Sequence, residues 1–134
     1  MDLKQKRILY VDDQEDMCFL MKIVFDHNGL ETVTANTGAE ALELAKKEDF
    51  DLFLIDNLLP DMSGVELCRE IRASDRQTPV VFFSGMERKS DKEAALSAGA
   101  QSYVVKPAAP DTVLRAVCTA LRQGVPGQQT MAGA

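Results

Sequence analysis

The sequence predicts an α/β domain built on a parallel sheet. Short apolar runs alternate along the chain with longer stretches whose apolar residues recur at helical spacing. Two of the runs, Leu52–Ile55 and Val80–Phe83, are entirely apolar, as expected of strands that are covered on both faces. Strict alternation of this kind favours parallel strands joined by right-handed crossovers. The 134 residues suffice for one such domain and are too few for two.

The strand signal is clearer in the first strand–helix unit than in the second. The first strand is apolar throughout, whereas the second only alternates apolar with polar residues. In the first helix, the helical spacing of Met17, Leu20, Met21 and Val24 predicts the face that packs on the sheet. The predicted ranges are Ile8–Val11 and Thr32–Ala35 for the strands, and Asp16–His27 and Gly38–Glu48 for the helices.

The remaining three units follow the same order, and helix-start and helix-stop residues support the assignment. The predicted ranges are Leu52–Ile55, Val65–Ala73, Val80–Phe83, Asp91–Ala98, Tyr103–Val105 and Asp111–Arg122. The pairs Thr37 with Glu40, Ser63 with Glu66 and Ser90 with Glu93 have capping-box spacing. Gly29, Gly99 and Gly124 stand where helices are expected to end.

Composition excludes several classes of protein. The net charge of −6 argues against direct binding to nucleic acid, which needs a basic face. The longest unbroken apolar run, Met17–Met21, is too short to span a membrane. No signal peptide is visible, and three widely spaced cysteines do not form a disulfide framework, so we expect a cytoplasmic protein. Residues 1–123 are expected to form the domain and residues 124–134 a flexible tail or linker stub.

Polar side chains follow four of the five predicted strands. Asp12 and Asp13 come after the first, Asp56 after the third, Ser84 after the fourth and Lys106 after the fifth. Because ligand sites of parallel sheets lie beyond the carboxyl ends of the strands, we expect these side chains to converge.

Three carboxylates in one small site repel one another, so the cluster must hold a proton, an ammonium group or a metal ion. The site offers oxygen ligands without histidine or cysteine, which suits a hard cation such as Mg²⁺. A carboxylate beside Mg²⁺ can attack a phosphoryl group and form an aspartyl-phosphate. The lysine and the hydroxyl would then bind the phosphoryl oxygens.

Several motifs together resemble the response regulator receiver domains of two-component signalling, the family of the chemotaxis receiver. The resemblance covers about residues 5–123. It rests on the acidic pair Asp12-Asp13, the segment from Asp56 to Gly64, Ser84, Tyr103 and the Lys106-Pro107 dipeptide. It implies a doubly wound, flavodoxin-like fold with five parallel strands in the order 2-1-3-4-5.

The resemblance also implies roles for individual residues. Asp56 would accept a phosphoryl group from a phosphohistidine on a sensor histidine kinase or a histidine phosphotransfer protein. Asp13 and Asp56 would bind Mg²⁺, or Mn²⁺, through their carboxylates, Leu58 through its backbone carbonyl and Asp12 through a water molecule.

On the phosphoryl side, Lys106 would bind a phosphoryl oxygen, and its bond to Pro107 would be cis. The backbone amide of Gly85 and the hydroxyl of Ser84 would bind the phosphoryl group, and Tyr103 would follow Ser84 inward. This repacking of the surface around the fourth helix, fifth strand and fifth helix would control an output domain or partner protein. The protein would thus be a signalling phosphoacceptor and not an enzyme that turns over a separate substrate.

The sequence departs from the family pattern at Asn57, where an apolar residue is usual, and at Gly85, where alanine is usual. Gly85 removes a methyl group from the phosphate site and loosens the loop. The first helix is apolar on more than one face, through Cys18, Phe19, Ile23 and Phe25. These residues are either buried between the sheet and a neighbouring helix or form a docking patch, which the resemblance favours because kinases and phosphotransfer domains contact this helix.

Two other functions fit the same fold class. A pseudo-receiver would serve as an interaction module without phosphate, but the set of Asp12, Asp13, Asp56, Ser84 and Lys106 is complete. A small Mg²⁺-dependent phosphatase would need a second acid two residues after Asp56 and a substrate-binding cap. The residue at that position is Leu58, and the chain has no room for a cap.

Overall fold

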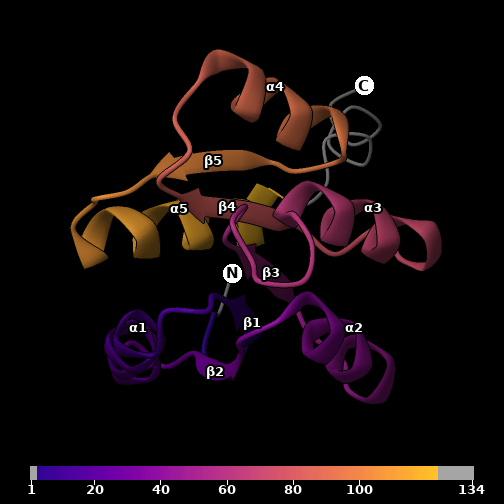
Figure 1. The fold of residues 1–134 in the computed structure, drawn as a ribbon. Coiled ribbons are helices and arrows are strands. Elements are labelled where there is room, and N and C mark those ends of the chain that lie inside the picture. Colours follow the sequence, from indigo (N-terminus) through magenta and orange to yellow (C-terminus); the bar gives the residue numbers. More distant parts are fainter. Residues whose placement is uncertain (1–2, 124–134) are drawn as a thin grey trace, which may run out of the picture.

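The structure, a computed structural model, describes residues 3–123 and shows five strands alternating with five helices (Figure 1). The tail or linker stub predicted for residues 124–134 lies outside the described residues. None of the helices within 3–123 is long and apolar enough to cross a membrane. The strands are β1 (Arg7–Val11), β2 (Glu31–Ala35), β3 (Leu52–Ile55), β4 (Val80–Ser84) and β5 (Ser102–Val105), and the helices are α1 (Glu15–His27), α2 (Gly38–Lys47), α3 (Gly64–Ser74), α4 (Lys89–Ser97) and α5 (Pro110–Gln123).

All strand pairs are parallel, and the strands lie in the order β2-β1-β3-β4-β5, as the sequence and its resemblance predict. The register matters for the site. Val11, the last residue of β1, pairs with Ile55, the last residue of β3. The residues that follow these two strands therefore leave the sheet side by side.

Two apolar layers hold the sheet between the helices. Side chains of α1 and α5 pack on one face, and those of α2, α3 and α4 pack on the other, an arrangement visible in Figure 1. All four residues of β3 and the first four of β4 are buried, since neighbouring strands and helices cover them on every side. Burial on both faces is the physical reason that these strands read as continuous apolar runs.

The helix boundaries follow the predicted signals at most ends. Thr37 and Ser63 accept hydrogen bonds from the backbone N–H groups of Glu40 and Glu66, and so cap α2 and α3. Gly29 and Gly99 adopt positive φ values of 87° and 113° just beyond α1 and α4, where a side chain would strain the backbone.

The predicted start of α4 is wrong. The helix begins at Lys89, so Ser90 lies inside its first turn and not at its cap. The carboxylate of Asp91 accepts a hydrogen bond from the backbone N–H of Arg88 and closes this end of the helix. A charged carboxylate is the stronger acceptor here and also suits the positive end of the helix dipole.

The predicted inner face of α1 is partly wrong as well. Cys18, Met21 and Phe25 are the residues buried against the sheet, whereas Leu20 is 44% exposed. Phe19 and Ile23 are exposed still further, at 72% and 51%. Because this helix is apolar on more than one face, hydropathy alone does not set its rotation about its own axis.

Candidate functional site

Three carboxylates meet at the carboxyl edge of the sheet. Asp12 and Asp13 follow β1, and Asp56 follows β3, its neighbour in the sheet. One oxygen from each of the three lies within 4.8 Å of the others. Asp12 is fully buried and Asp56 is 5% exposed, while Asp13 faces solvent. The sequence prediction that these residues converge is confirmed.

Lys106 joins this cluster from the end of β5. Its Nζ atom lies 2.7 Å from Oδ2 of Asp12 and 3.2 Å from Oδ2 of Asp56. The backbone N–H of Lys106 donates to the carbonyl of Ser84, which fixes the loop against β4, and the Lys106–Pro107 bond is cis. Partial burial lowers the pKa of Lys106, but the hydrogen bond and charge of Asp12 and the charge of Asp56 outweigh it and raise the pKa overall. The ammonium group therefore stays charged.

The donor set fits a hard divalent cation. Three carboxylates and one ammonium leave the cluster with a net charge of −2, which a dication would balance. The groups offered are oxygens, and the exposed Asp13 opens the cluster to solvent, so a bound ion could keep water molecules. These properties suit Mg²⁺ better than metals that prefer nitrogen or sulfur ligands.

Asp12 is held by two neighbours that the sequence prediction missed. The hydroxyl of Tyr10 donates to Oδ2 of Asp12 at 2.6 Å, and the backbone N–H of Gln14 donates to Oδ1 at 2.9 Å. Burial, followed by the hydrogen bond to Asp12, raises the pKa of Tyr10, so the phenol remains a proton donor. The spacing of Tyr10 and Asp12, two residues apart on an extended strand, is the signal that could have found this contact.

The segment after Asp56 is a tight loop that leads into α3. The backbone N–H of Leu58 donates to Oδ1 of Asp56 at 3.2 Å. The side chain of Asn57 accepts a hydrogen bond from the backbone N–H of Val65 and caps α3, which explains a polar residue at this position. A Cβ atom on Gly64 would lie 2.5 Å from the carbonyl oxygen of Asp56, so only glycine lets the loop pass this closely.

Asp61 ties the same loop to α2. Its carboxylate accepts hydrogen bonds from the backbone N–H groups of Gly38 and Ala39 at 2.8 and 2.9 Å. These two bonds lower the pKa of Asp61. The loop that carries Asp56 is thereby anchored at the positive end of the α2 dipole.

Ser84, Gly85 and Leu58 border a hollow beside Asp56. The hydroxyl of Ser84 accepts a hydrogen bond from the backbone N–H of Met86, and a Cβ on Gly85 would meet nothing within 4 Å. The hollow measures about 460 Å³ and is lined by Asp13, Gln14, Asp56, Leu58, Ser84, Gly85, Met86 and Lys106. It is large enough for a tetrahedral oxyanion next to the Asp56 carboxylate.

Tyr103 lies at a distance from this hollow and not in its lining. Its hydroxyl donates to the carbonyl of Met86 at 2.6 Å, and its ring stacks on Phe82 with 5.6 Å between centroids. The backbone of Met86 thus makes both contacts: its carbonyl accepts from the Tyr103 hydroxyl, and its N–H donates to the Ser84 hydroxyl. This chain of contacts connects the hollow to β5.

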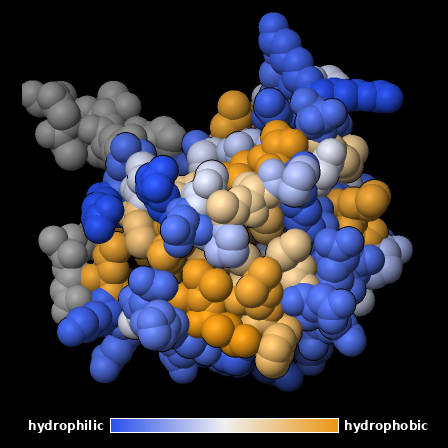
Figure 2. Space-filling view, turned by 90° about the vertical axis from the view of Figure 1, so that its left-hand side faces the viewer, coloured by the Kyte–Doolittle hydropathy of each residue, from blue (hydrophilic) through white to orange (hydrophobic). Residues whose placement is uncertain are grey.

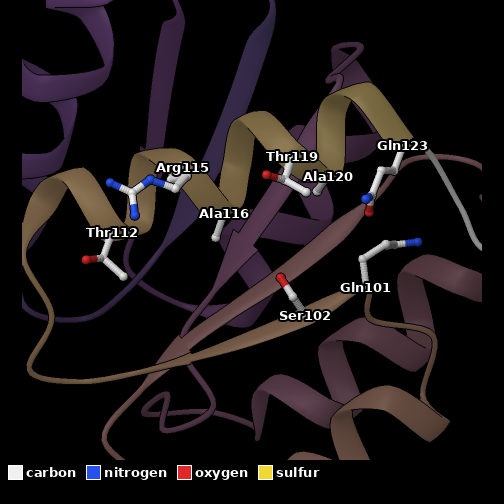
Figure 3. Close-up of a pocket in the computed structure, with 8 residues that line it drawn as sticks. All are labelled: Gln101, Ser102, Thr112, Arg115, Ala116, Thr119, Ala120 and Gln123. Carbon is white, nitrogen blue, oxygen red and sulfur yellow. The ribbon is translucent and has the colours of Figure 1, made fainter.

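A separate cavity of about 300 Å³ lies between β5 and α5 (Figure 3). It shares no lining residue with the hollow beside Asp56. Its lining residues include Arg115 and the hydroxyl-bearing Ser102, Thr112 and Thr119, alongside a larger share of apolar surface. The acidic cluster and Lys106 do not reach it, so the chemistry of the site belongs to the hollow at the sheet edge.

Comparison with known proteins agrees with this geometry. The chain matches the family described as "Response regulator receiver domain" over residues 8–118. It is 34% identical over 118 residues to the alkaline phosphatase synthesis transcriptional regulatory protein PhoP of Bacillus subtilis, covering 88% of this chain and 49% of that protein. It is also 34% identical over 123 residues to the DNA-binding response regulator MtrA of Mycolicibacterium smegmatis, covering 92% and 54%. The chain thus spans about half the length of these curated relatives.

Solved structures are similar over nearly their whole length. A CheY-like receiver domain protein from Methanospirillum hungatei has a TM-score of 0.85 at 31% identity, covering 89% of this chain and 95% of that chain. The chemotaxis response regulator CheY4 of Vibrio cholerae has a TM-score of 0.82 at 28% identity, covering 87% and 98%.

Proposed function

The chain belongs to the response regulator receiver domain family, and from this premise we propose that Asp56 is its phosphoacceptor. One observation carries the proposal: Lys106 contacts both Asp12 and Asp56 beside a hollow that is large enough for a phosphoryl group. An oxygen of Asp56 would attack the phosphorus of a phosphohistidine. The P–N bond would break, and the imidazole nitrogen would keep the electron pair.

The neighbours of Asp56 would stabilise the charge that develops on the phosphoryl oxygens. Lys106 is already 3.2 Å from Asp56 and supplies a fixed positive charge. The Ser84 hydroxyl and the backbone N–H of Gly85 border the hollow from β4 and can donate to the same oxygens. These groups come from different strands, so the transferred group is bound from several sides.

We propose that Mg²⁺ binds at the acidic cluster, with Mn²⁺ as a substitute. Asp13 and Asp56 would hold it directly, Leu58 would offer its carbonyl, and the buried Asp12 would act through a water molecule. When bound, the ion offsets negative charge between the carboxylates and the phosphoryl oxygens.

Phosphorylation is proposed to act on the surface around α4, β5 and α5 through Ser84 and Tyr103. A phosphoryl group that draws the Ser84 hydroxyl would take it from the N–H of Met86. Tyr103 bonds the carbonyl of the same residue, so its ring is coupled to that change. The result is a shift between two arrangements of one surface.

A donor protein is proposed to dock on α1. Phe19, Leu20 and Ile23 are exposed apolar side chains on this helix, and Figure 2 shows hydrophobic atoms gathered on this side of the molecule. An apolar patch beside a charged site is typical of an interaction surface. The donor would be a sensor histidine kinase or a histidine phosphotransfer protein in the cytoplasm.

The longer relatives indicate what kind of output a receiver of this family can control. PhoP is described as a transcriptional regulatory protein and MtrA as DNA-binding, and this chain matches about half of each. We propose that the receiver acts on an output domain or partner protein through its α4-β5-α5 surface, without touching nucleic acid itself. The alternative of a pseudo-receiver is not favoured, because Asp12, Asp13, Asp56 and Lys106 lie in one cluster and Ser84 lines the hollow beside it.

Transfer from purified histidine kinases separates the roles of the site and of the docking surface. The Phe19→Glu variant should accept phosphate from acetyl phosphate at the normal rate but from its cognate kinase at least tenfold more slowly. Glu43→Gln, on the exposed face of α2, serves as a control. Equal slowing with both donors, or no slowing with the kinase, would reject α1 as the docking surface. Failure of the parent protein with both donors would reject the phosphoacceptor itself.

A further inference from the structure

A fully buried tyrosine lies beneath the acidic cluster. Tyr10 is near the end of β1, a central strand, and pairs with Thr34 of β2 and Leu54 of β3. Its side chain belongs to the apolar layer under α1 and α5, where it is 0% exposed. Residues two apart on a strand point to the same face, so the phenol extends toward Asp12 and donates to Oδ2 at 2.6 Å.

This oxygen accepts a second hydrogen bond. The Nζ atom of Lys106 lies 2.7 Å from the same Oδ2, and Gln14 donates its backbone N–H to Oδ1. A carboxylate oxygen has two lone pairs in its plane, so Tyr10 and Lys106 together fill Oδ2. Each donor takes a share of the negative charge of the Asp12 carboxylate, which is 0% exposed.

Sharing of this kind affects where Lys106 sits. The lysine lies 2.7 Å from Asp12 and 3.2 Å from Asp56, so the two acids compete for one ammonium. Without the phenol, Asp12 would be a buried charge with one partner fewer, and its attraction for Lys106 would increase. Lys106 would then be held further from Asp56, which is the place where the phosphoryl oxygens must be bound.

We propose that Tyr10 is a positioning residue for phosphoryl transfer: its hydroxyl satisfies Asp12 from inside the core and so leaves Lys106 available to the phosphoryl group on Asp56. The inference rests on the proposed function of Asp56. Tyr10 touches neither the phosphoryl group nor the metal, and acts through Asp12 and Lys106.

Tyr10→Phe tests this role, because it keeps the ring and removes only the hydroxyl. We expect phosphorylation by acetyl phosphate at saturating Mg²⁺ to slow about fivefold to tenfold. We expect Mn²⁺, measured by electron paramagnetic resonance without phosphodonor, to bind about twofold to fivefold more tightly. The Asp12 carboxylate would no longer share its negative charge with the Tyr10 hydroxyl, and Lys106 would repel the ion less at Asp56. A slower reaction with tighter metal binding is a combination that simple loss of folding does not produce.

A matched control removes another buried hydroxyl. Oγ1 of Thr32 is buried without a hydrogen-bond partner, so Thr32→Val should change neither the rate nor the Mn²⁺ affinity. If Tyr10→Phe behaves like this control, or if its rate and its metal affinity fall together, the proposal is overturned. If the parent protein is not phosphorylated at all, the proposed function fails, whereas the Mn²⁺ titration still tests the link between Tyr10 and the cluster.

Two further measurements keep the test decisive. In a Lys106→Met background the rate effect of Tyr10→Phe should vanish, because there is no lysine left to misplace; a persisting fivefold loss would contradict the mechanism. The chain has two tyrosines, so in a Tyr103→Phe protein 3-fluorotyrosine replaces Tyr10 alone. Its stronger phenol donor should shift rate and metal affinity in the opposite directions to Tyr10→Phe, and an unchanged protein would count against the proposal.

Discussion

The ammonium of Lys106 lies 2.7 Å from Oδ2 of Asp12, closer than its 3.2 Å contact with Asp56. Asp12 follows β1 and Lys106 follows β5, so this ion pair closes the site across β3 and β4, the two strands that lie between them. The pair has two consequences. It partly neutralises a crowded acidic cluster, and it keeps a positive charge next to the proposed phosphoacceptor.

Lys106→Met is expected to separate these two consequences. Phosphorylation should slow roughly 100-fold because one fixed donor to the phosphoryl oxygens is lost. Mg²⁺ should bind more tightly because a competing positive charge is removed. Isothermal titration and a phosphorylation time course measure the two effects, with the exposed Lys92→Met as control. Weaker Mg²⁺ binding in Lys106→Met would contradict this account.

Gly64→Ala and Gly85→Ala form a second test, because they add the same methyl group on either side of the site. At Gly64 the new Cβ would lie 2.5 Å from the carbonyl of Asp56 and 2.8 Å from Cα of Asn57, so we expect a loss of about 1–3 kcal/mol in the free energy of unfolding. At Gly85 the methyl would meet nothing within 4 Å, and stability should stay near that of the parent. Urea unfolding compares the two, and equal stabilities would show that the loop can yield.

Arg72 joins three segments through backbone carbonyls. It donates to the carbonyls of Gly99, Thr78 and Asp75, and burial lowers its pKa. Arg72→Met should lower the free energy of unfolding by about 2 kcal/mol and speed amide exchange at the end of α4. Arg69→Met, on the exposed side of the same helix, should do neither. If amide exchange at the end of α4 were unchanged in Arg72→Met, Arg72 would not have this bridging role.

The free energy of unfolding should depend on pH in the acidic range because Asp61 titrates there. The backbone N–H groups of Gly38 and Ala39 lower the pKa of Asp61, so its contribution is present above its unfolded pKa and is lost as pH falls through the folded value. Asp61→Ala should therefore cost about 1 kcal/mol at pH 7 and less as the buffer becomes strongly acidic. Urea unfolding across this range checks the trend. A difference that grows toward acid would have the wrong sign for this cap.

The sequence predicted the sheet and the convergence of the acidic residues because both depend on local pattern and chain order. Apolar runs mark the strands, and parallel strands carry whatever follows them to one edge. Asp12, Asp13, Asp56 and Lys106 meet for that reason.

Other features depend on tertiary contacts that a linear pattern does not contain. The rotation of α1, with Cys18 and Phe25 inside and Leu20 outside, is set by packing, since the helix is apolar on several faces. Asp61 was passed over because its partners at the start of α2 lie more than twenty residues earlier. At α4 two capping signals overlap, and Asp91 rather than Ser90 closes the helix.

The central claim is that Asp56 accepts a phosphoryl group with the help of a divalent cation. Intact mass after incubation with acetyl phosphate tests it most directly, with and without Mg²⁺ and with Asp56→Asn alongside. We expect the mass of one phosphoryl group to be added only when both Asp56 and Mg²⁺ are present. No addition to a folded protein that binds Mg²⁺, or addition to Asp56→Asn, would contradict the account.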